Sequence, residues 1–160
     1  MTTAKNEGEP ITEAGLKALR AEISELETVG RRDIAARILT ARGHGDLKEN
    51  AEYHAAKEDQ AHLETRISRL RQRWRNAVVV DVAQGPGMAF SFGRTAEVLD
   101  QETGEVHVWT IVGAAEADRE QGKLSAEAPV GKALLDHPAG ATVEVPTPSG
   151  TRRLTIERIL

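Results

Sequence analysis

The 160-residue sequence contains no cysteine, which excludes disulfide bonds, thiolate zinc sites and cysteine nucleophiles. Aromatic residues are also scarce, at 3 % of the chain, and no apolar run approaches the ~20 residues of a membrane span. The opening segment MTTAKNEGEP has no apolar signal core. We therefore expect a cytoplasmic protein that is neither exported nor associated with a membrane.

Signatures of an independent enzyme are missing as well. Ser91, Ser125 and Ser149 lack the context of a nucleophile elbow, and the segments GPG and FGRT do not match phosphate-binding loops. The few aromatic residues of the second half argue against a hydrophobic peptide-binding pocket there.

The charges are unevenly distributed along the chain, whose net charge is −4. Residues 1–77 hold 14 Lys and Arg against 13 Asp and Glu, whereas residues 78–160 hold 7 against 12. A free DNA-binding domain is usually basic, so the composition gives little indication of one. The balanced and charge-dense first half is typical of an exposed helical hairpin.

Apolar residues in this first half follow a helical period. Residues 1–10 are polar and read as a loose tail, and Thr12 is a suitable N-cap for a helix that follows it. Gly30 then falls on an apolar position, and the pattern resumes out of register, which predicts a break or bend near this glycine. The apolar positions of this arm are Leu16, Leu19, Ile23, Leu26, Ile34, Ile38 and Ala41.

A second helix is expected after the turn at Gly43 and Gly45. Its apolar positions alternate spacings of three and four, as in a heptad seam, with one polar member, Gln60. The two runs predict an N-terminal antiparallel coiled-coil hairpin over residues 11–77, with an acidic tip near residues 43–50. A first arm of about 30 residues would reach roughly 45 Å. The seam positions are Tyr53, Ala56, Gln60, Leu63, Ile67, Leu70, Trp74 and Ala77.

Residues 78–160 change in character and predict a small α+β domain. The segment RTAEVLDQETGEVHVWTIVG indicates two strands around a turn at Gly104, and TVEVPTPSGTRRLTIERIL a second strand pair turning at residues 148–150. Between them, PVGKALLDHPAG predicts one short helix that ends near Pro138. QGPG, residues 84–87, predicts a loop. Strand pairs interrupted by one helix are typical of an antiparallel α+β fold.

Two acids at the expected tip, Asp46 and Glu49, allow two interpretations. The spacing Asp-x-x-Glu is close to a capping box, in which both side chains satisfy backbone amides at a helix start. Alternatively, positions i and i+3 place two carboxylates on one face at the end of a rod. Such a pair would hold Mg²⁺ weakly, because this ion takes six oxygens, so another macromolecule would have to supply further ligands.

Histidines and basic residues surround these acids. His44 and His54 flank the pair, but their spacing matches no common zinc pattern. Farther along, RISRLRQRWR carries five arginines, which either pair with Glu22, Glu25 and Glu27 of the first arm or form a basic surface for an acidic partner. Nearer the tip, a phosphate backbone could meet four basic residues, Arg37, Arg42, Lys48 and Lys57.

The tip segment HGDLKENAEYHAAKE resembles the tip of the GreA/GreB family of bacterial transcript cleavage factors, and GreA most closely. The resemblance extends to ITEAGLKALRAEISEL and RRDIAARI in the first arm. It also includes SFGRTAEVLD, WTIVGAAEAD and APVGKALLDHPAGATVEVPTPSG in the second half. It thus covers nearly the whole chain beyond residues 1–8.

The resemblance implies that a small FKBP-like antiparallel β-sheet domain docks on bacterial RNA polymerase near its secondary channel. The coiled coil then enters the channel and promotes cleavage of the nascent RNA 3′ end in backtracked complexes. The polymerase performs the cleavage, so the factor is not an enzyme on its own, and we expect a monomer. Asp46 and Glu49 match the family's two catalytic acids, which hold Mg²⁺ jointly with the polymerase in a two-metal cleavage.

The docking loop departs from the family pattern at one position. The family usually has Ser-Pro before the short helix, whereas this chain has Ala128-Pro129. Glu127, Ala128 and Pro129 remain the docking candidates, with the strength of docking left open by the lost hydroxyl.

Three other functions are compatible with parts of the sequence. One is a relative that occupies the channel and inhibits transcription, although an inhibitor has no need of the Asp46 and Glu49 spacing. Another is a peptidyl-prolyl isomerase, which the aromatic-poor second half disfavours. The last is a coiled-coil adaptor, in which neutralising the tip acids would change stability alone.

Overall fold

The computed structural model describes residues 8–45, 48–81 and 89–160. It divides into two compact units, which we call the hairpin unit (residues 16–77) and the sheet unit (residues 1–15 and 78–160). No helix in these described ranges is long and apolar enough to cross a membrane.

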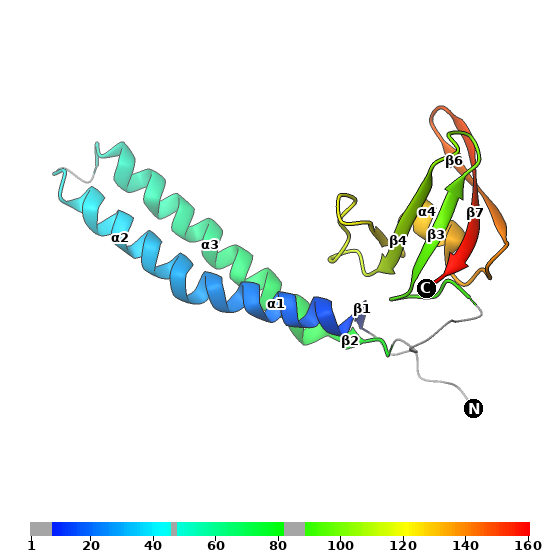
Figure 1. The fold of residues 1–160 in the computed structure, drawn as a ribbon. Coiled ribbons are helices and arrows are strands. Elements are labelled where there is room, and N and C mark those ends of the chain that lie inside the picture. Colours follow the sequence, from blue (N-terminus) through cyan, green and yellow to red (C-terminus); the bar gives the residue numbers. More distant parts are fainter. Residues whose placement is uncertain (1–7, 46–47, 82–88) are drawn as a thin grey trace. The chain divides into compact units, whose positions relative to one another are not determined.

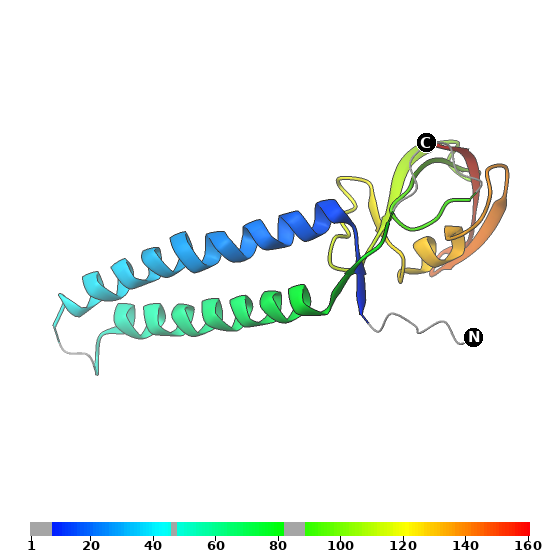
Figure 2. The ribbon, with the colours of Figure 1, turned by 90° about the horizontal axis from the view of Figure 1, so that it is seen from below.

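Two antiparallel helical arms form the hairpin, as predicted (Figures 1 and 2). The first arm runs through α1 (Glu13–Glu25), the π-helical turn η1 (Leu26–Gly30) and α2 (Arg31–Arg42). The second arm is the single helix α3 (Ala51–Asn76). Each arm carries one apolar stripe and can bury it only against the stripe of the other arm. The hairpin fold follows from this pairing.

The predicted seam is the buried face of both arms. Its fully buried members are Leu19, Ala41, Ala56, Ile67 and Leu70, and most of the others are half-buried. Trp74 is the exception, because 45 % of its surface is exposed although the heptad pattern places it on the seam. The heptad pattern therefore predicts that Trp74 faces the first arm but not that it stays exposed there.

The break or bend predicted near Gly30 takes the form of a local irregularity, because the chain stays helical through Gly30 but passes through a π-helical turn there. Gly30 has helical dihedral angles, φ −59° and ψ −49°, and the helix continues directly into α2. The apolar spacing contains one extra residue here, and a π-helical turn accommodates one extra residue without ending the helix. A Cβ at Gly30 would lie 3.3 Å from Cδ1 of Leu63, so the glycine permits close approach of the two arms.

The sheet unit contains a five-stranded sheet in the order β5-β4-β3-β7-β6. Both predicted strand pairs are confirmed, and α4 (Pro129–Leu134) is the predicted short helix. The sheet is mixed and not wholly antiparallel, because β5 pairs in parallel with β4 after a crossing loop. The strands are β3 (Thr95–Asp100), β4 (Val106–Val112), β5 (Lys123–Ser125), β6 (Thr142–Thr147) and β7 (Gly150–Ile159).

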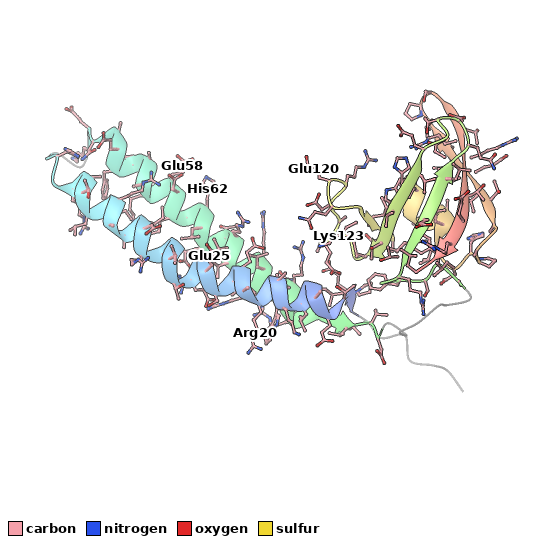
Figure 3. All side chains as sticks on the ribbon, in the orientation of Figure 1. Arg20, Glu25, Glu58, His62, Glu120 and Lys123 are labelled. Atoms are coloured by element: carbon pink, nitrogen blue, oxygen red, sulfur yellow. The ribbon has the colours of Figure 1, made fainter. Side chains whose placement is uncertain are left out.

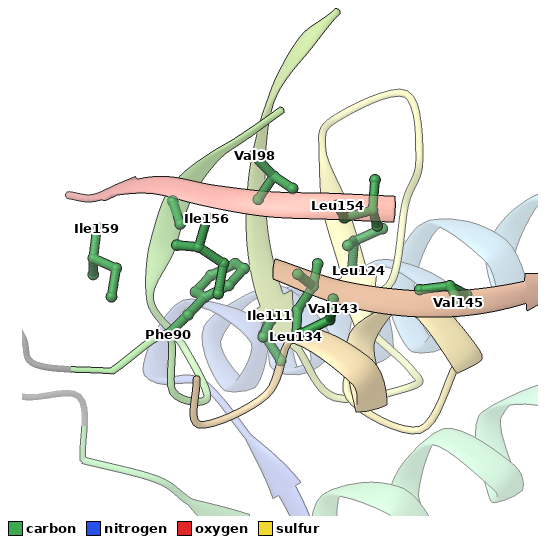
Figure 4. Packing of buried hydrophobic residues seen from close by; sticks show 11 residues of the cluster. Phe90, Val98, Ile111, Leu124, Leu134, Val143, Val145, Leu154, Ile156 and Ile159 are labelled. Atoms are coloured by element: carbon green, nitrogen blue, oxygen red, sulfur yellow. The ribbon is translucent and has the colours of Figure 1, made fainter. Parts of the chain in front are cut away.

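One hydrophobic core lies against this sheet (Figure 4). Alternate residues of β3 and β7 point into it, including Ala96, Val98, Leu154 and Ile156, all with no exposed surface. Leu134 of α4 is equally buried. Strand alternation and one apolar helix face therefore account for the core.

An ion pair between a buried carboxylate and a half-buried arginine joins β3 to β7. Asp100 is 1 % exposed, and Nε of Arg152 donates to its Oδ2 at 3.0 Å. The backbone amides of Glu102 and Thr103 donate to its Oδ1 at 2.9 and 3.4 Å. The hydrogen bond from Arg152 lowers the pKa of Asp100, the two amides add to this effect, and burial opposes it.

The beginning of the chain is more ordered than we predicted. Glu9 and Pro10, expected in a loose tail, belong to β1 (Glu9–Ile11), which pairs with β2 (Ala77–Val79). The amide of Val80 donates to the carbonyl of Ile11 at 3.0 Å, and Ile11 is buried. Burial of Ile11 and pairing of its backbone hold these residues, while residues 1–7 and the predicted loop 84–87 lie outside the described residues.

Thr12 is the N-cap of α1, as predicted, because its hydroxyl accepts from the amide of Gly15 at 3.0 Å. Glu116 also accepts from the amide of Thr12, at 3.1 Å. A Cβ at Gly15 would collide with the Glu116 carboxylate. The glycine therefore makes room for a carboxylate at the start of the helix, where the helix dipole favours negative charge.

Candidate functional site

The turn between the two arms is built by glycine. After α2 ends at Arg42, the amides of Gly43 and His44 still bond to carbonyls of the last helical turn, at 3.1 Å each. Gly45 then has φ +106°, in the left-handed region that glycine adopts without strain. Asp46 lies outside the described residues, and the chain continues through a turn at Lys48 and Glu49.

Asn50 is the N-cap of α3, and the sequence prediction missed it. Its Oδ1 accepts from the amide of Tyr53 at 3.1 Å, and its Nδ2 donates to the carbonyl of Ala41 at 2.5 Å. One side chain therefore starts the second arm and ties it to the last turn of the first. Asparagine is among the preferred N-cap residues, so the sequence did contain a signal.

The capping-box interpretation of Asp46 and Glu49 is therefore wrong for Glu49. Helix α3 begins at Ala51, so Glu49 precedes the cap and cannot occupy the third helical position. Glu49 is exposed and makes no hydrogen bond or ion pair among the described residues. Its carboxylate is free to accept a cation or a hydrogen-bond donor from another molecule.

The four basic residues predicted near the tip have different surroundings. Nη2 of Arg37 lies 2.9 Å from Oδ2 of Asp59, and Nζ of Lys57 donates to Oε1 of Gln60 at 3.0 Å. Arg42 is exposed and has no hydrogen-bond or ion-pair partner within the described residues. Arg42 is thus available to bind another molecule beside the turn, whereas Arg37 and Lys57 already contact side chains of α3.

The two histidines of the tip have separate partners. Nε2 of His44 lies 3.3 Å from Oε2 of Glu52, whereas Nε2 of His54 donates to the carbonyl of Lys48 at 3.1 Å. Among the described residues, no group of three His, Asp or Glu side chains gathers around a common point. The two contacts link the turn to the first residues of α3.

Ion pairs across the two arms account for part of the arginine-rich segment. Arg66 pairs with Glu22 and Arg71 with Glu27, as predicted. Closer to the middle of the hairpin, Nε and Nη2 of Arg31 donate to the two carboxylate oxygens of Glu64 at 2.9 and 3.0 Å. The hydrogen bond from Arg31 lowers the pKa of Glu64. Apart from the half-buried Glu27, these side chains are largely exposed, so each pair adds little to stability.

The predicted docking loop lies at the start of α4. Glu127 and Pro129 are exposed, Ala128 is half-buried at the N-cap, and Pro129 occupies the first helical turn. Ala128 has an extended backbone but no side chain that could cap the helix. The loop is instead held by Ser125, whose Oγ accepts from the amide of Glu127 at 3.1 Å.

Comparisons with known proteins match both halves of the chain. A family model described as "Transcription elongation factor, N-terminal" matches residues 9–79, and one described as "Transcription elongation factor, GreA/GreB, C-term" matches residues 86–160. The chain is 43 % identical over 150 residues to transcription elongation factor GreA of Nitrobacter hamburgensis, covering 94 % of this chain and 95 % of the relative. GreA of Listeria welshimeri is 41 % identical over 150 residues, with 94 % of each protein covered.

Among solved structures, a similar chain is GreA factor homolog 1 of Thermus thermophilus. The sequence identity is 26 % and the TM-score 0.43, over 96 % of this chain and 99 % of the other.

Proposed function

Because the chain belongs to the GreA/GreB family of transcription elongation factors, we propose that it acts on backtracked bacterial RNA polymerase. In this proposal the hairpin enters the secondary channel and stimulates cleavage of the displaced RNA 3′ end by the polymerase itself. The new, aligned 3′ end then allows elongation to resume. The protein acts as a monomer in the cytoplasm, where the polymerase works, and is not a nuclease alone.

The observation that carries this proposal is the cap of α3. Asn50 supplies the capping hydrogen bond, so the fold does not use Glu49 for this purpose. An exposed carboxylate in a turn, with no partner among the described residues, has no evident structural role. This favours delivery of the carboxylate to another molecule.

The hairpin provides the reach that delivery requires. Helix α3 has 26 residues, which at 1.5 Å per residue span about 39 Å. The apolar seam holds the arms together and Asn50 ties them at the turn, so the exposed Glu49 is not needed for their stability. A rod of this length can place its tip residues deep in a channel while its base stays outside.

The donor chemistry of the tip fits a magnesium ion shared with the polymerase. Asp46 and Glu49 offer carboxylate oxygens, the hard ligands that Mg²⁺ prefers, and the exposed Glu49 can approach an ion held elsewhere. When bound between carboxylates and RNA, such an ion activates water and stabilises charge on phosphate oxygens. Arg42 can approach the RNA phosphates beside the turn, and Lys48 adds positive charge there. Arg37 and Lys57 line the arms behind them.

Docking is assigned to the loop before α4. Glu127 and Pro129 are exposed and Ala128 lies between them, so this short segment can contact the polymerase near the channel. The backbone of the loop keeps its shape through Ser125 and Pro129 despite the missing hydroxyl.

A backtracked elongation complex with labelled RNA tests this function. The wild type should accelerate Mg²⁺-dependent cleavage, and the double variant Asp46→Asn/Glu49→Gln should lose about 100-fold or more of this stimulation while still binding polymerase. Glu58→Gln is the matched control, since it removes an exposed carboxylate farther along α3 and should keep full activity. If wild type and double variant both bind and neither cleaves, the protein is a channel-binding inhibitor.

A further inference from the structure

A groove of about 510 Å³ opens between α1 and the last turns of α3, at the end of the hairpin away from the tip. Arg20 and Ile23 line it from α1, Glu27 from η1, and Arg71, Trp74 and Arg75 from α3. These positions repeat at helical spacings of three and four, so each arm presents one face to the groove. The volume lies within the range of small-molecule sites.

Trp74 is the unexpected residue of this groove. The heptad pattern places it on the seam, yet 45 % of its surface is exposed, and the arms do not close over it. Its indole ring therefore offers an apolar face to the groove. Tryptophan on an exposed helix position has a large hydrophobic surface and stacks well on planar groups.

The groove is also strongly basic. Arg20, which projects from α1 (Figure 3), and Arg75 have no hydrogen-bond or ion-pair partner among the described residues. Of the three arginines that line the groove, Arg71 alone is neutralised, by Glu27. Two uncompensated guanidinium groups beside an exposed indole leave a site that is both cationic and aromatic.

We propose that this groove binds one nucleotide, with its base stacked on Trp74 and its phosphates paired with Arg20 and Arg75. Aromatic side chains stack on nucleotide bases whatever the base is. Arginine pairs with phosphate through two parallel hydrogen bonds. An acidic peptide would use the arginines but would gain little from the indole. The nucleotide is either a free nucleoside triphosphate or one unit of single-stranded RNA, because both carry the same base and phosphate chemistry.

This inference does not depend on polymerase, so it can be tested on the chain alone. In a Trp109→Phe background, Trp74 is the sole tryptophan, and its fluorescence reports on the groove. ATP should quench this fluorescence in a saturable way. Inorganic triphosphate lacks a base and should bind about tenfold more weakly without such quenching. A second titration replaces ATP with an oligoadenylate that carries a 5′-hydroxyl. The ligand that binds more tightly shows whether the groove takes a free nucleoside triphosphate or a unit of single-stranded RNA.

Matched variants distinguish binding in the groove from nonspecific attraction of the nucleotide to positive charge. Arg20→Gln/Arg75→Gln and Trp74→Leu should each weaken ATP or oligoadenylate binding about tenfold, measured by calorimetry with helicity checked by circular dichroism. Arg32→Gln removes an exposed arginine of α2 outside the groove and should leave binding unchanged. The proposal is overturned if neither nucleotide ligand binds, if triphosphate binds as well as ATP, or if Arg32→Gln weakens binding equally. It is also overturned if a hexaglutamate peptide competes as well as ATP.

Discussion

The hairpin unit and the sheet unit bury their apolar residues in different ways. Among the described residues, the hairpin buries five along one seam between neighbouring helices, and the sheet unit gathers eleven in a core drawn from strands far apart in sequence. Their ion pairs differ as well. The cross-arm pairs of the hairpin keep both partners at least partly exposed, whereas one pair of the sheet unit contains the almost completely buried Asp100.

The difference shows where each unit can tolerate change. The hairpin is held along a single line of apolar contacts, and its ion pairs lie at the surface. Residues at the surface and the tip can therefore vary without disturbing the fold, so functional side chains can occupy the turn. A closed core with a buried charge is sensitive to single substitutions. We therefore expect substitutions to separate into those that change activity at the tip and those that change stability in the sheet.

The largest effect on stability is expected for Leu154→Ala. Leu154 is fully buried in the middle of β7, and removing three carbons from a closed core costs about 3–4 kcal/mol in the free energy of unfolding. Chemical denaturation measures this loss. The matched control is Leu39→Ala on α2, where the side chain is 72 % exposed, and the expected change is within about 0.5 kcal/mol. Equal losses in the two variants would contradict the contrast between the closed core of the sheet unit and the exposed surface of the hairpin.

Asp100→Asn should lower the free energy of unfolding by about 3 kcal/mol at neutral pH, because it leaves Arg152 without its carboxylate. The pKa of Asp100 is lowered in the folded state. Its contribution is therefore complete above the unfolded-state value of about 3.9 and is lost as the pH falls through the folded-state pKa.

Denaturation of wild type and variant across pH 2–7 checks this sign, and the two curves should converge at low pH. Glu144→Gln is the control, because the Glu144 and Arg153 side chains are both 62 % exposed and should contribute little. A difference that stays constant down to pH 2 would exclude the ionised carboxylate as the source of stability.

Much of the fold could be predicted from local patterns. The hairpin seam and the two strand pairs follow from periods of 3.5 and 2, which involve neighbours in sequence. An irregularity near Gly30 was predicted, but its π-helical form was missed because glycine was read as a helix breaker, although the extra residue in the apolar spacing indicated an insertion. The short strands β1, β2 and β5 have three residues each, too few for any period, and depend on distant partners.

The site was predicted less completely than the fold. Asp46 and Asn50 are both suitable N-caps by residue type, so propensity alone could not choose between them. The choice of Asn50 is favoured by its bond to Ala41 in the other arm, which is a tertiary contact. Similarly, the heptad pattern placed Trp74 on the seam but could not predict its exposure. Trp74 is exposed because a groove opens between the two arms at this end of the hairpin.

A smaller effect is expected for Asn50→Ala, which sharpens the distinction between stability and activity within the tip itself. Loss of the cap and of the bond to Ala41 should lower the free energy of unfolding by about 1–2 kcal/mol. Glu49→Gln should leave this free energy unchanged within about 0.5 kcal/mol, because its side chain is exposed and unpartnered among the described residues. Thermal unfolding followed by circular dichroism compares the two. A larger loss for Glu49→Gln would return this carboxylate to a capping role.

The smallest effect is expected for Ala128→Ser, which introduces the hydroxyl that the family resemblance led us to expect here. The extended backbone at this N-cap, φ −71° and ψ 153°, suits a serine that accepts from an amide of the first turn of α4. The free energy of unfolding should rise by about 0.5–1 kcal/mol. Ala61→Ser in the exposed middle of α3 is the matched control and should lower it by about 0.5 kcal/mol, because serine forms helix less readily than alanine. If the serine also tightens binding to polymerase by more than this stabilisation explains, the hydroxyl contacts the polymerase directly. If stability rises while affinity does not, its role is to cap α4.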